Sequence, residues 1–150
     1  MNKVFLALGF GIMVFAACGT TPAVPTYKAT LNGANEKPTA VTTAGVGTAS
    51  ATLDGATLTL KIDYSGLSGT PTLAHIHGPA DETATAGVIC NFTDKIAAGA
   101  GATAGTGTIN ATCPISATFT VADLDASKMY FNLHTTANGG GEVRGQLKKQ

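Results

Sequence analysis

Three histidines are the residues of this chain best suited to bind a metal ion. His75 and His77 are separated by one residue, and His134 lies far downstream. On a β-strand, His75 and His77 point to the same face, with Cα atoms about 7 Å apart. Their imidazoles can therefore converge on one ion, and imidazole suits both copper and zinc. The pattern predicts a copper or zinc site at these three residues, with water, Asp81 or Glu82 as fourth ligand.

The same residues also have a purely structural interpretation. In it, the histidines hydrogen-bond to loops, to Asn138 or to Glu142, and fix one end of the fold. Arg144 has two interpretations as well. It either attracts an anion to the metal or holds a partner's carboxylate, or it forms a salt bridge or hydrogen bond that holds the Gly-rich turn at 138–141. Both interpretations remain open at the level of the sequence.

The elements that must position these side chains are β-strands. Several windows alternate apolar and polar residues with a period of two, and Asp54-Gly55 is a hairpin signal. The predicted strands are 27–32, 46–53, 58–64, 72–77, 86–92, 106–112, 115–121, 128–134 and 142–148. One helical turn is expected at 122–127, and a low-complexity loop at 97–108. Eight or nine short strands predict an all-β, antiparallel Greek-key sandwich or flattened barrel.

Alternation also predicts which side chains share a face around His134. Tyr130, Asn132 and His134 lie on one face of their strand, and Met129, Phe131 and Leu133 lie on the other, which resembles core. On the returning strand, a second polar set shares a face: Glu142, Arg144 and Gln146. The two strands therefore place His134 and Arg144 close together.

The N-terminus predicts export. Residues 1–17 carry Lys3 and then an apolar run too short to span a bilayer, which is the layout of a secretory signal peptide. Small residues before Cys18 resemble a bacterial lipoprotein cleavage box, although Phe15 stands where Leu is usual. We expect a lipidated Cys18, a flexible tether over 18–26 and one domain over 27–150. The protein would then be anchored by lipid to the bacterial cell envelope, at the periplasmic or outer surface.

The remaining cysteines agree with export. Once Cys18 is lipidated, Cys90 and Cys113 form an even pair in an oxidising compartment, which predicts a disulfide. Closing a loop of about 24 residues would stabilise the fold by roughly 3 kcal/mol.

Composition excludes other classes of protein. The chain has 9 basic and 9 acidic residues, so its formal net charge is zero, and only 12% of residues are charged. A nucleic-acid binder needs an excess of Lys and Arg, and a coiled coil needs many charged helix formers. No Ser-His-Asp arrangement, phosphate loop or dinucleotide fingerprint is indicated. The sequence therefore favours a protein that is not an enzyme.

Two motifs resemble the CHRD domain, named for the repeats of chordin. They are Ala-His-Ile-His-Gly-Pro-Ala at 74–80 and Phe-Asn-Leu-His-Thr-Thr-Ala-Asn-Gly-Gly-Gly-Glu-Val-Arg-Gly-Gln-Leu at 131–147. Gly139 replaces the family's usual Pro, which loosens the turn without altering the polar residues. The resemblance implies an immunoglobulin-like antiparallel sandwich and, by analogy with chordin, an extracellular protein partner. It implies no established activity for bacterial members.

A weaker similarity links the chain to copper/zinc superoxide dismutase. There a His-x-His pair and a late His bind copper, and a late Arg guides the anion, which would match His75, His77, His134 and Arg144. The chain lacks the fourth copper His and the zinc cluster, so dismutase activity is not expected. We expect a lipid-anchored binding or structural module. The alternative is a copper- or zinc-binding protein with a minor redox activity.

Overall fold

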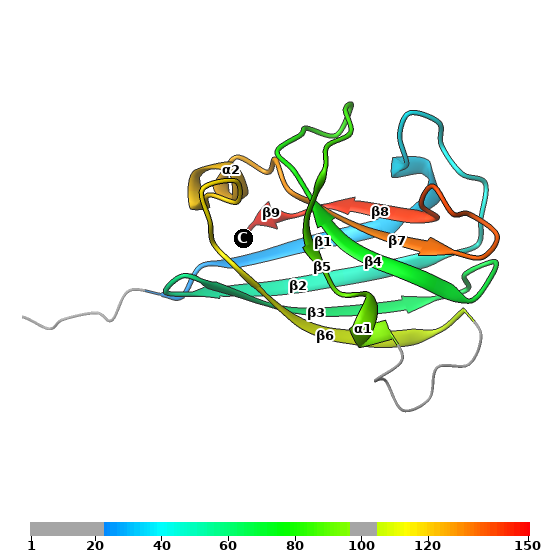
Figure 1. The fold of residues 1–150 in the computed structure, drawn as a ribbon, viewed down its shortest axis with the longest axis horizontal. Helices are drawn as coiled ribbons and strands as arrows, with labels where there is room; N and C mark the ends of the chain where they lie inside the picture. The colour runs from blue at the N-terminus through cyan, green and yellow to red at the C-terminus, as the bar shows by residue number, and fades with distance from the viewer. Residues whose placement is uncertain (1–22, 97–104) are drawn as a thin grey trace, which may run out of the picture.

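The computed structural model describes residues 23–96 and 105–150, which form an antiparallel β-fold with three short helices (Figure 1). The strands are β1 (Thr26–Asn32), β2 (Val46–Asp54), β3 (Thr57–Ser65), β4 (Pro71–His77), β5 (Val88–Asn91), β6 (Gly107–Pro114), β7 (Tyr130–Thr135), β8 (Val143–Gln146) and β9 (Lys148–Lys149). The helices are η1 (Gly33–Asn35), α1 (Thr93–Ile96) and α2 (Val121–Asp125). None of the described helices is long and apolar enough to cross a membrane.

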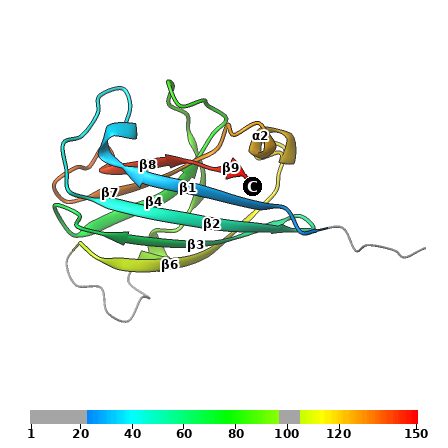
Figure 2. The same ribbon diagram turned by 180° about the vertical axis from the view of Figure 1, so that it is seen from behind.

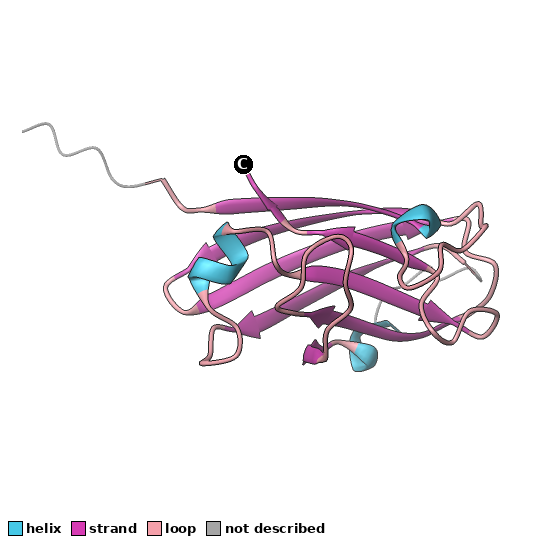
Figure 3. Cartoon of the chain, turned by 90° about the horizontal axis from the view of Figure 1, so that it is seen from above, coloured by secondary structure: helices cyan, strands magenta, loops and turns pink. Residues whose placement is uncertain are grey.

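The strands form one curled sheet in the order β5-β4-β7-β8-β1-β2-β3-β6, and β9 pairs with β1. All pairings are antiparallel. The sheet folds over itself, so that β4, β5 and β7 form one layer and β2, β3 and β6 the other (Figures 1 and 2). From above, the helices lie at the periphery of these layers (Figure 3). The predicted all-β antiparallel sandwich is confirmed.

The core lies between the layers and follows the predicted alternation. In β2 and β3, residues alternate between solvent and core along nine positions each. Small residues of β2 such as Ala49 and Ala51 belong to one continuous apolar cluster with larger ones such as Ile76 and Phe131. Alternating small and large side chains lets two sheets pack closely with few aromatic residues.

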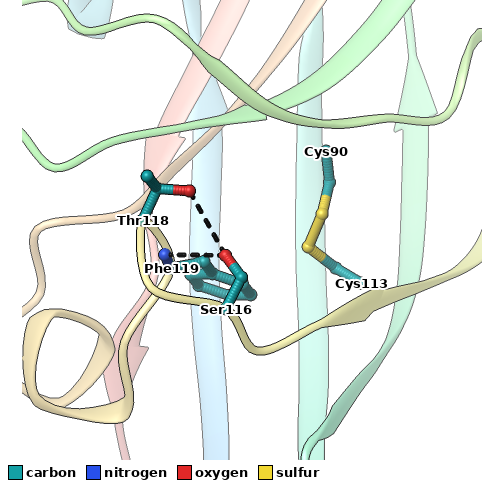
Figure 4. The surroundings of a disulfide bond; sticks show 5 residues. All are labelled: Cys90, Cys113, Ser116, Thr118 and Phe119. Atoms are coloured by element: carbon teal, nitrogen blue, oxygen red, sulfur yellow. Dashed lines mark hydrogen bonds between the residues drawn. A yellow bond between two sulfur atoms is a disulfide. The ribbon is translucent and has the colours of Figure 1, made fainter.

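The two edge strands of the sheet are joined by a covalent bond. β5 and β6 are the first and last strands of the order, and Cys90 of β5 is disulfide-bonded to Cys113 of β6 (Figure 4). Both cysteines are buried, and their Cα atoms are 6.0 Å apart. The predicted disulfide is confirmed, and it closes the seam of the nearly closed sheet.

The strand predicted at 115–121 does not form. Ser116 and Phe119 make an isolated bridge, and the Ser116 hydroxyl accepts a hydrogen bond from the Phe119 N–H at 3.1 Å (Figure 4). Thr120 then caps α2, because its side chain accepts from the Asp123 N–H. Local Ser and Thr hydrogen bonds thus replace a sheet ladder. The helical turn predicted at 122–127 exists as α2, shifted one residue earlier at its start.

Several other element boundaries differ between the sequence prediction and the structure. The segment predicted as one strand at 142–148 is divided into β8 and β9, and the strand predicted at 86–92 shortens to the four residues of β5. Most of the low-complexity loop lies outside the described residues, but positions 107 and 108 belong to β6. The predicted signal peptide, Cys18 and most of the predicted tether also lie outside them, and Thr26 of the tether belongs to β1.

Candidate metal centre

β4 and β7 are neighbours in the sheet, and together they bring the three histidines onto one face. His75 pairs with Asn132, and His134 is two residues further along β7 on the same side. The intervening residues Ile76 and Leu133 point into the core and are fully buried. The alternation that fills the core therefore also aims the histidines away from it.

The histidine rings are close enough to share one ion. The centroid of the His75 ring lies 5.3 Å from that of His77 and 5.1 Å from that of His134. One potential ligand atom from each residue lies within 4.8 Å of the others. His75 and His134 are buried and His77 is half-buried. The structure thus brings together the three residues selected from the sequence.

Backbone carbonyls orient two of the rings. His77 Nδ1 lies 3.0 Å from the Ala86 oxygen, and His134 Nδ1 lies 3.1 Å from the Gly139 oxygen. A carbonyl oxygen only accepts, so each Nδ1 carries the proton and each Nε2 presents a lone pair. This outer hydrogen bond is typical of histidine ligands of metals.

The inward nitrogens have no partner. His75 Nδ1, His77 Nε2 and His134 Nε2 are buried, and none has a hydrogen-bond partner among the described residues. An unpartnered buried polar atom costs on the order of 1–3 kcal/mol. The structural interpretation is therefore correct only in part: two rings bind loop carbonyls, yet none of the three rings binds Asn138 or Glu142 through its side chain.

Burial keeps all three rings neutral. It lowers the pKa of His75 to about 4, with further lowering by the neighbouring His134 and His77. Burial also lowers the pKa of His77 and His134, against hydrogen bonds to backbone that act in the opposite direction. Neutral imidazole is the form that binds a metal, so at neutral pH no proton has to leave.

A cation and an aromatic ring adjoin the cluster. The Arg144 guanidinium lies 3.6 Å from the centre of the Tyr130 ring, and the His77 ring stacks on Tyr130 at 5.0 Å. β7 lies between β4 and β8, so the two groups reach Tyr130 from opposite neighbours. His134 and Arg144 line one pocket of about 140 Å³, as their predicted proximity requires.

Sequence reasoning missed Glu36 in this pocket. Glu36 is only 4% exposed, and both of its carboxyl oxygens accept from Asn132 Nδ2. Burial raises its pKa to about 7, although the Asn132 bond and the charge of Arg144 lower it. Glu36 follows η1, and a loop residue in an Asn-Glu-Lys-Pro run carries no periodic signal that could place it.

Glu142 and Asn138 organise the Gly-rich turn instead of binding the histidines. The Glu142 carboxylate accepts hydrogen bonds from Thr43, Thr135 and Ser68, and Asn138 Nδ2 donates to the Ser68 hydroxyl. Burial alone would raise the pKa of Glu142, but these bonds outweigh it and lower the pKa to about 2. Both side chains tie the turn after β7 to neighbouring loops.

The expected carboxylate ligands lie elsewhere. Asp81 accepts hydrogen bonds from the backbone and hydroxyl of Thr83, and Glu82 is exposed and pairs with Lys148 at 2.7 Å. Neither belongs to the histidine cluster. A short Asx turn holds the Asp81 side chain in its own loop. Its closeness to His77 in the sequence therefore does not bring it to the histidines.

Comparison with known proteins gives one match. The family model described as the CHRD domain matches residues 27–147, which is most of the chain. No curated protein and no solved structure matches the chain.

Proposed function

We propose that this chain, which belongs to the CHRD domain family, is a copper- or zinc-binding protein whose ligands are His75, His77 and His134. The family suggests a binding or structural module in general terms, and the proposal gives that module a ligand. The observation that carries it is the convergence of three buried, unpartnered histidine nitrogens within 4.8 Å.

The donor set narrows the choice of metal. Three neutral imidazoles supply borderline-soft nitrogen ligands, which suit Cu and Zn, whereas Ca and Mg prefer oxygen. The rings are oriented by β4, β7 and two carbonyl hydrogen bonds before any metal arrives. A preformed site loses little conformational entropy on binding, and a fourth position stays open for water or another ligand.

Isothermal titration of the full chain with Cu(II) and with Zn(II) tests the proposal. We expect one ion per chain and no binding by the His75→Ala/His77→Ala variant. Lys61→Gln, on the exposed surface of β3, is a control that should bind as the wild type does. Elemental analysis of protein from its native host identifies the metal. Equal heats from wild type and the double variant would refute the proposal.

We also propose that the protein is exported and anchored at the cell envelope through lipid on Cys18. The layout of residues 1–18 supports this, and so does the Cys90–Cys113 disulfide, since such bonds persist in oxidising compartments. Acyl chains contribute about 0.8 kcal/mol per buried methylene, so two or three hold a domain at a membrane. An extracellular protein partner, as in chordin, fits the same location.

A phase-separation experiment in detergent tests the anchor. The wild type should partition into the detergent phase, and Cys18→Ser should stay in the aqueous phase or keep its uncleaved signal peptide. Partitioning of a cleaved Cys18→Ser protein like that of the wild type would contradict lipidation.

A further inference from the structure

Arg144 is a buried cation without an acidic partner. The residue is 2% exposed, it is the chain's single arginine, and no described carboxylate forms a salt bridge with it. Its Nη2 donates to the Asp81 carbonyl at 3.0 Å, and the described residues provide its guanidinium with no other hydrogen bond. Because arginine stays charged and has five N–H donors, this burial is costly unless an anion balances it.

Tyr130 packs against that cation. The Arg144 Cζ atom lies over the Tyr130 ring, 3.6 Å from its centre, so the ring supports the guanidinium on one side. A rigid planar fork matches the two oxygens of a carboxylate. The pocket beside it also contains the buried, unpartnered Nε2 atoms of His77 and His134, which are the proposed metal ligands.

Arg144 and Lys37 line two adjoining pockets. Both line the pocket of about 140 Å³ that contains His77 and His134, and both line an adjoining pocket of about 260 Å³ with Glu82 and Gln146. An anion beside these two cations would therefore lie next to the pocket that contains His77 and His134. Pockets for drug-sized ligands have about 300–1,000 Å³, so this volume suits a small ion.

The pocket that contains the histidines favours an anion even though it contains one acid. Glu36 is the only described carboxyl group that lines it, against Arg144 and Lys37. Asn132 already binds both Glu36 oxygens and holds that carboxyl group away from a salt bridge with Arg144. Within this pocket the two cations face one carboxyl group, while the charge of Arg144 also acts on Asp81, and Glu82 lines the adjoining pocket.

We propose that Arg144 and Lys37 form a subsite for a small carboxylate anion, which supplies the fourth ligand of the metal held by the three histidines. The subsite rests on the proposed metal function. Carboxylate oxygen is an ordinary ligand of zinc, and the open position of a three-His site accepts it. The ligand that the sequence suggested at Asp81 or Glu82 would then come from solution.

Acetate is the probe, and the single arginine makes the readout unambiguous. The Arg144 Nε–H signal in ¹H–¹⁵N spectra of the full chain is followed during titration with sodium acetate, without metal and with Zn(II). Sodium chloride at equal ionic strength is the reference. We expect a saturable shift with acetate, tightened at least tenfold by Zn(II), and only a small linear shift with chloride.

Variants separate the subsite from general charge effects. Arg144→Lys keeps the charge and loses the fork, so acetate affinity, followed by the Ala86 amide, should fall about tenfold. Lys37→Gln should lower the affinity for acetate severalfold, and Lys61→Gln should leave that affinity unchanged. If Arg144→Lys does not fold, the acetate affinity of Lys37→Gln and the wild-type Arg144 signal still test the subsite.

The outcomes distinguish this proposal from the metal site. Acetate that shifts Arg144 no more than chloride overturns the subsite, and so does phosphate that binds more tightly than acetate. Zn(II) binding without any acetate response removes the subsite and leaves the metal site standing. An acetate response that depends on Arg144 in a chain that binds no metal supports the subsite while the metal function fails.

Discussion

At the residue scale, Glu142 and the three histidines are opposite cases of a buried titratable group. The Glu142 carboxylate is fully buried and accepts four hydrogen bonds, so its charge is stabilised in place. Each histidine is neutral and keeps an inward nitrogen without a partner. The first arrangement stabilises a turn without a ligand, whereas the second leaves three nitrogens available for the proposed metal.

Replacing Glu142 by Gln should destabilise the protein by about 3 kcal/mol, because the folded-state pKa near 2 lies below the usual 4.5. Urea unfolding at neutral pH measures the loss. The difference from wild type should shrink as pH falls from 4.5 toward 2, where the wild-type carboxylate gains its proton. Glu82→Gln, at an exposed site, should cost under about 0.5 kcal/mol. Equal losses in both variants would contradict this account.

The pH dependence of stability should show two opposing groups. The folded-state pKa of His75 is about 4, so the unfolded chain takes the proton first and stability falls as pH drops from 6.5 toward 4. The folded-state pKa of Glu36 is about 7, so the folded chain takes that proton first and stability rises as pH drops from 7 toward 4.5. In the metal-free wild type, Glu36 offsets part of the histidine effect, to which the lowered pKa values of His77 and His134 add.

Glu36→Gln separates the two effects. This variant should lose roughly 3 kcal/mol between pH 7 and pH 4, a larger loss than in wild type, because the histidine effect is then unopposed. Thermal unfolding at a series of pH values measures it. A variant whose pH profile matches the wild type would show that Glu36 titrates normally.

Tyr130→Phe should weaken metal binding about tenfold without unfolding the chain. The Tyr130 hydroxyl accepts from the Ala86 N–H at 3.1 Å, and the Ala86 oxygen orients His77. Loss of such an outer contact commonly costs 10–100-fold in affinity, roughly. Tyr64→Phe, at another buried tyrosine, is the control and should bind normally. Unchanged zinc affinity in Tyr130→Phe would remove Tyr130 from this positioning role.

At the element scale, period-two alternation was sufficient to predict most strands and the faces of their side chains. The shared face of His75, His77 and His134 follows from alternation plus the pairing of β4 with β7. Side-chain capping was the competing signal that the prediction missed at 115–121. Glu36 could not be predicted, because a loop residue reaches the site only through the tertiary structure.

The contact between β1 and β8 depends on Gly145. A Cβ atom there would lie 2.6 Å from the backbone oxygen of Thr30, which cannot rotate away. Gly145→Ala should therefore cost about 2 kcal/mol through overpacking. Gly139→Ala, where nothing lies within 4 Å, should be close to neutral. Chemical unfolding compares the two, and equal stability would show that β1 shifts freely.

At the scale of the whole molecule, a sheet with two ends behaves as a nearly closed one. β5 and β6 would each present an open edge, which invites pairing with other chains. The Cys90–Cys113 bond holds these edges together, and α1 lies over the same seam, in contact with β4 and β6. The even pair of cysteines in an exported chain predicted the bond, but its place between the edges required the topology.

Removal of the disulfide should destabilise the protein by roughly 3 kcal/mol, as chain entropy predicts for this loop length. The Cys90→Ala/Cys113→Ala variant should melt roughly 10 °C below the oxidised wild type. Wild type in reductant should approach the melting temperature of the variant. A double variant as stable as the oxidised wild type would show that the sheet closes without the bond.

The position of β1 in the sheet determines how the domain responds to a pulling force on its N-terminal segment. β1 is held on one side by β2 along its full length and on the other by β8 and β9. The chain before it enters at Thr26, in line with the strand, and the C-terminal Gln150 N–H donates to the Thr26 oxygen. A pull on the N-terminal segment therefore acts along β1 and strains its hydrogen bonds together, in shear. A strand at the edge would instead peel away one bond at a time, so the proposed anchor at Cys18 would load the domain at a strand that resists such a pull.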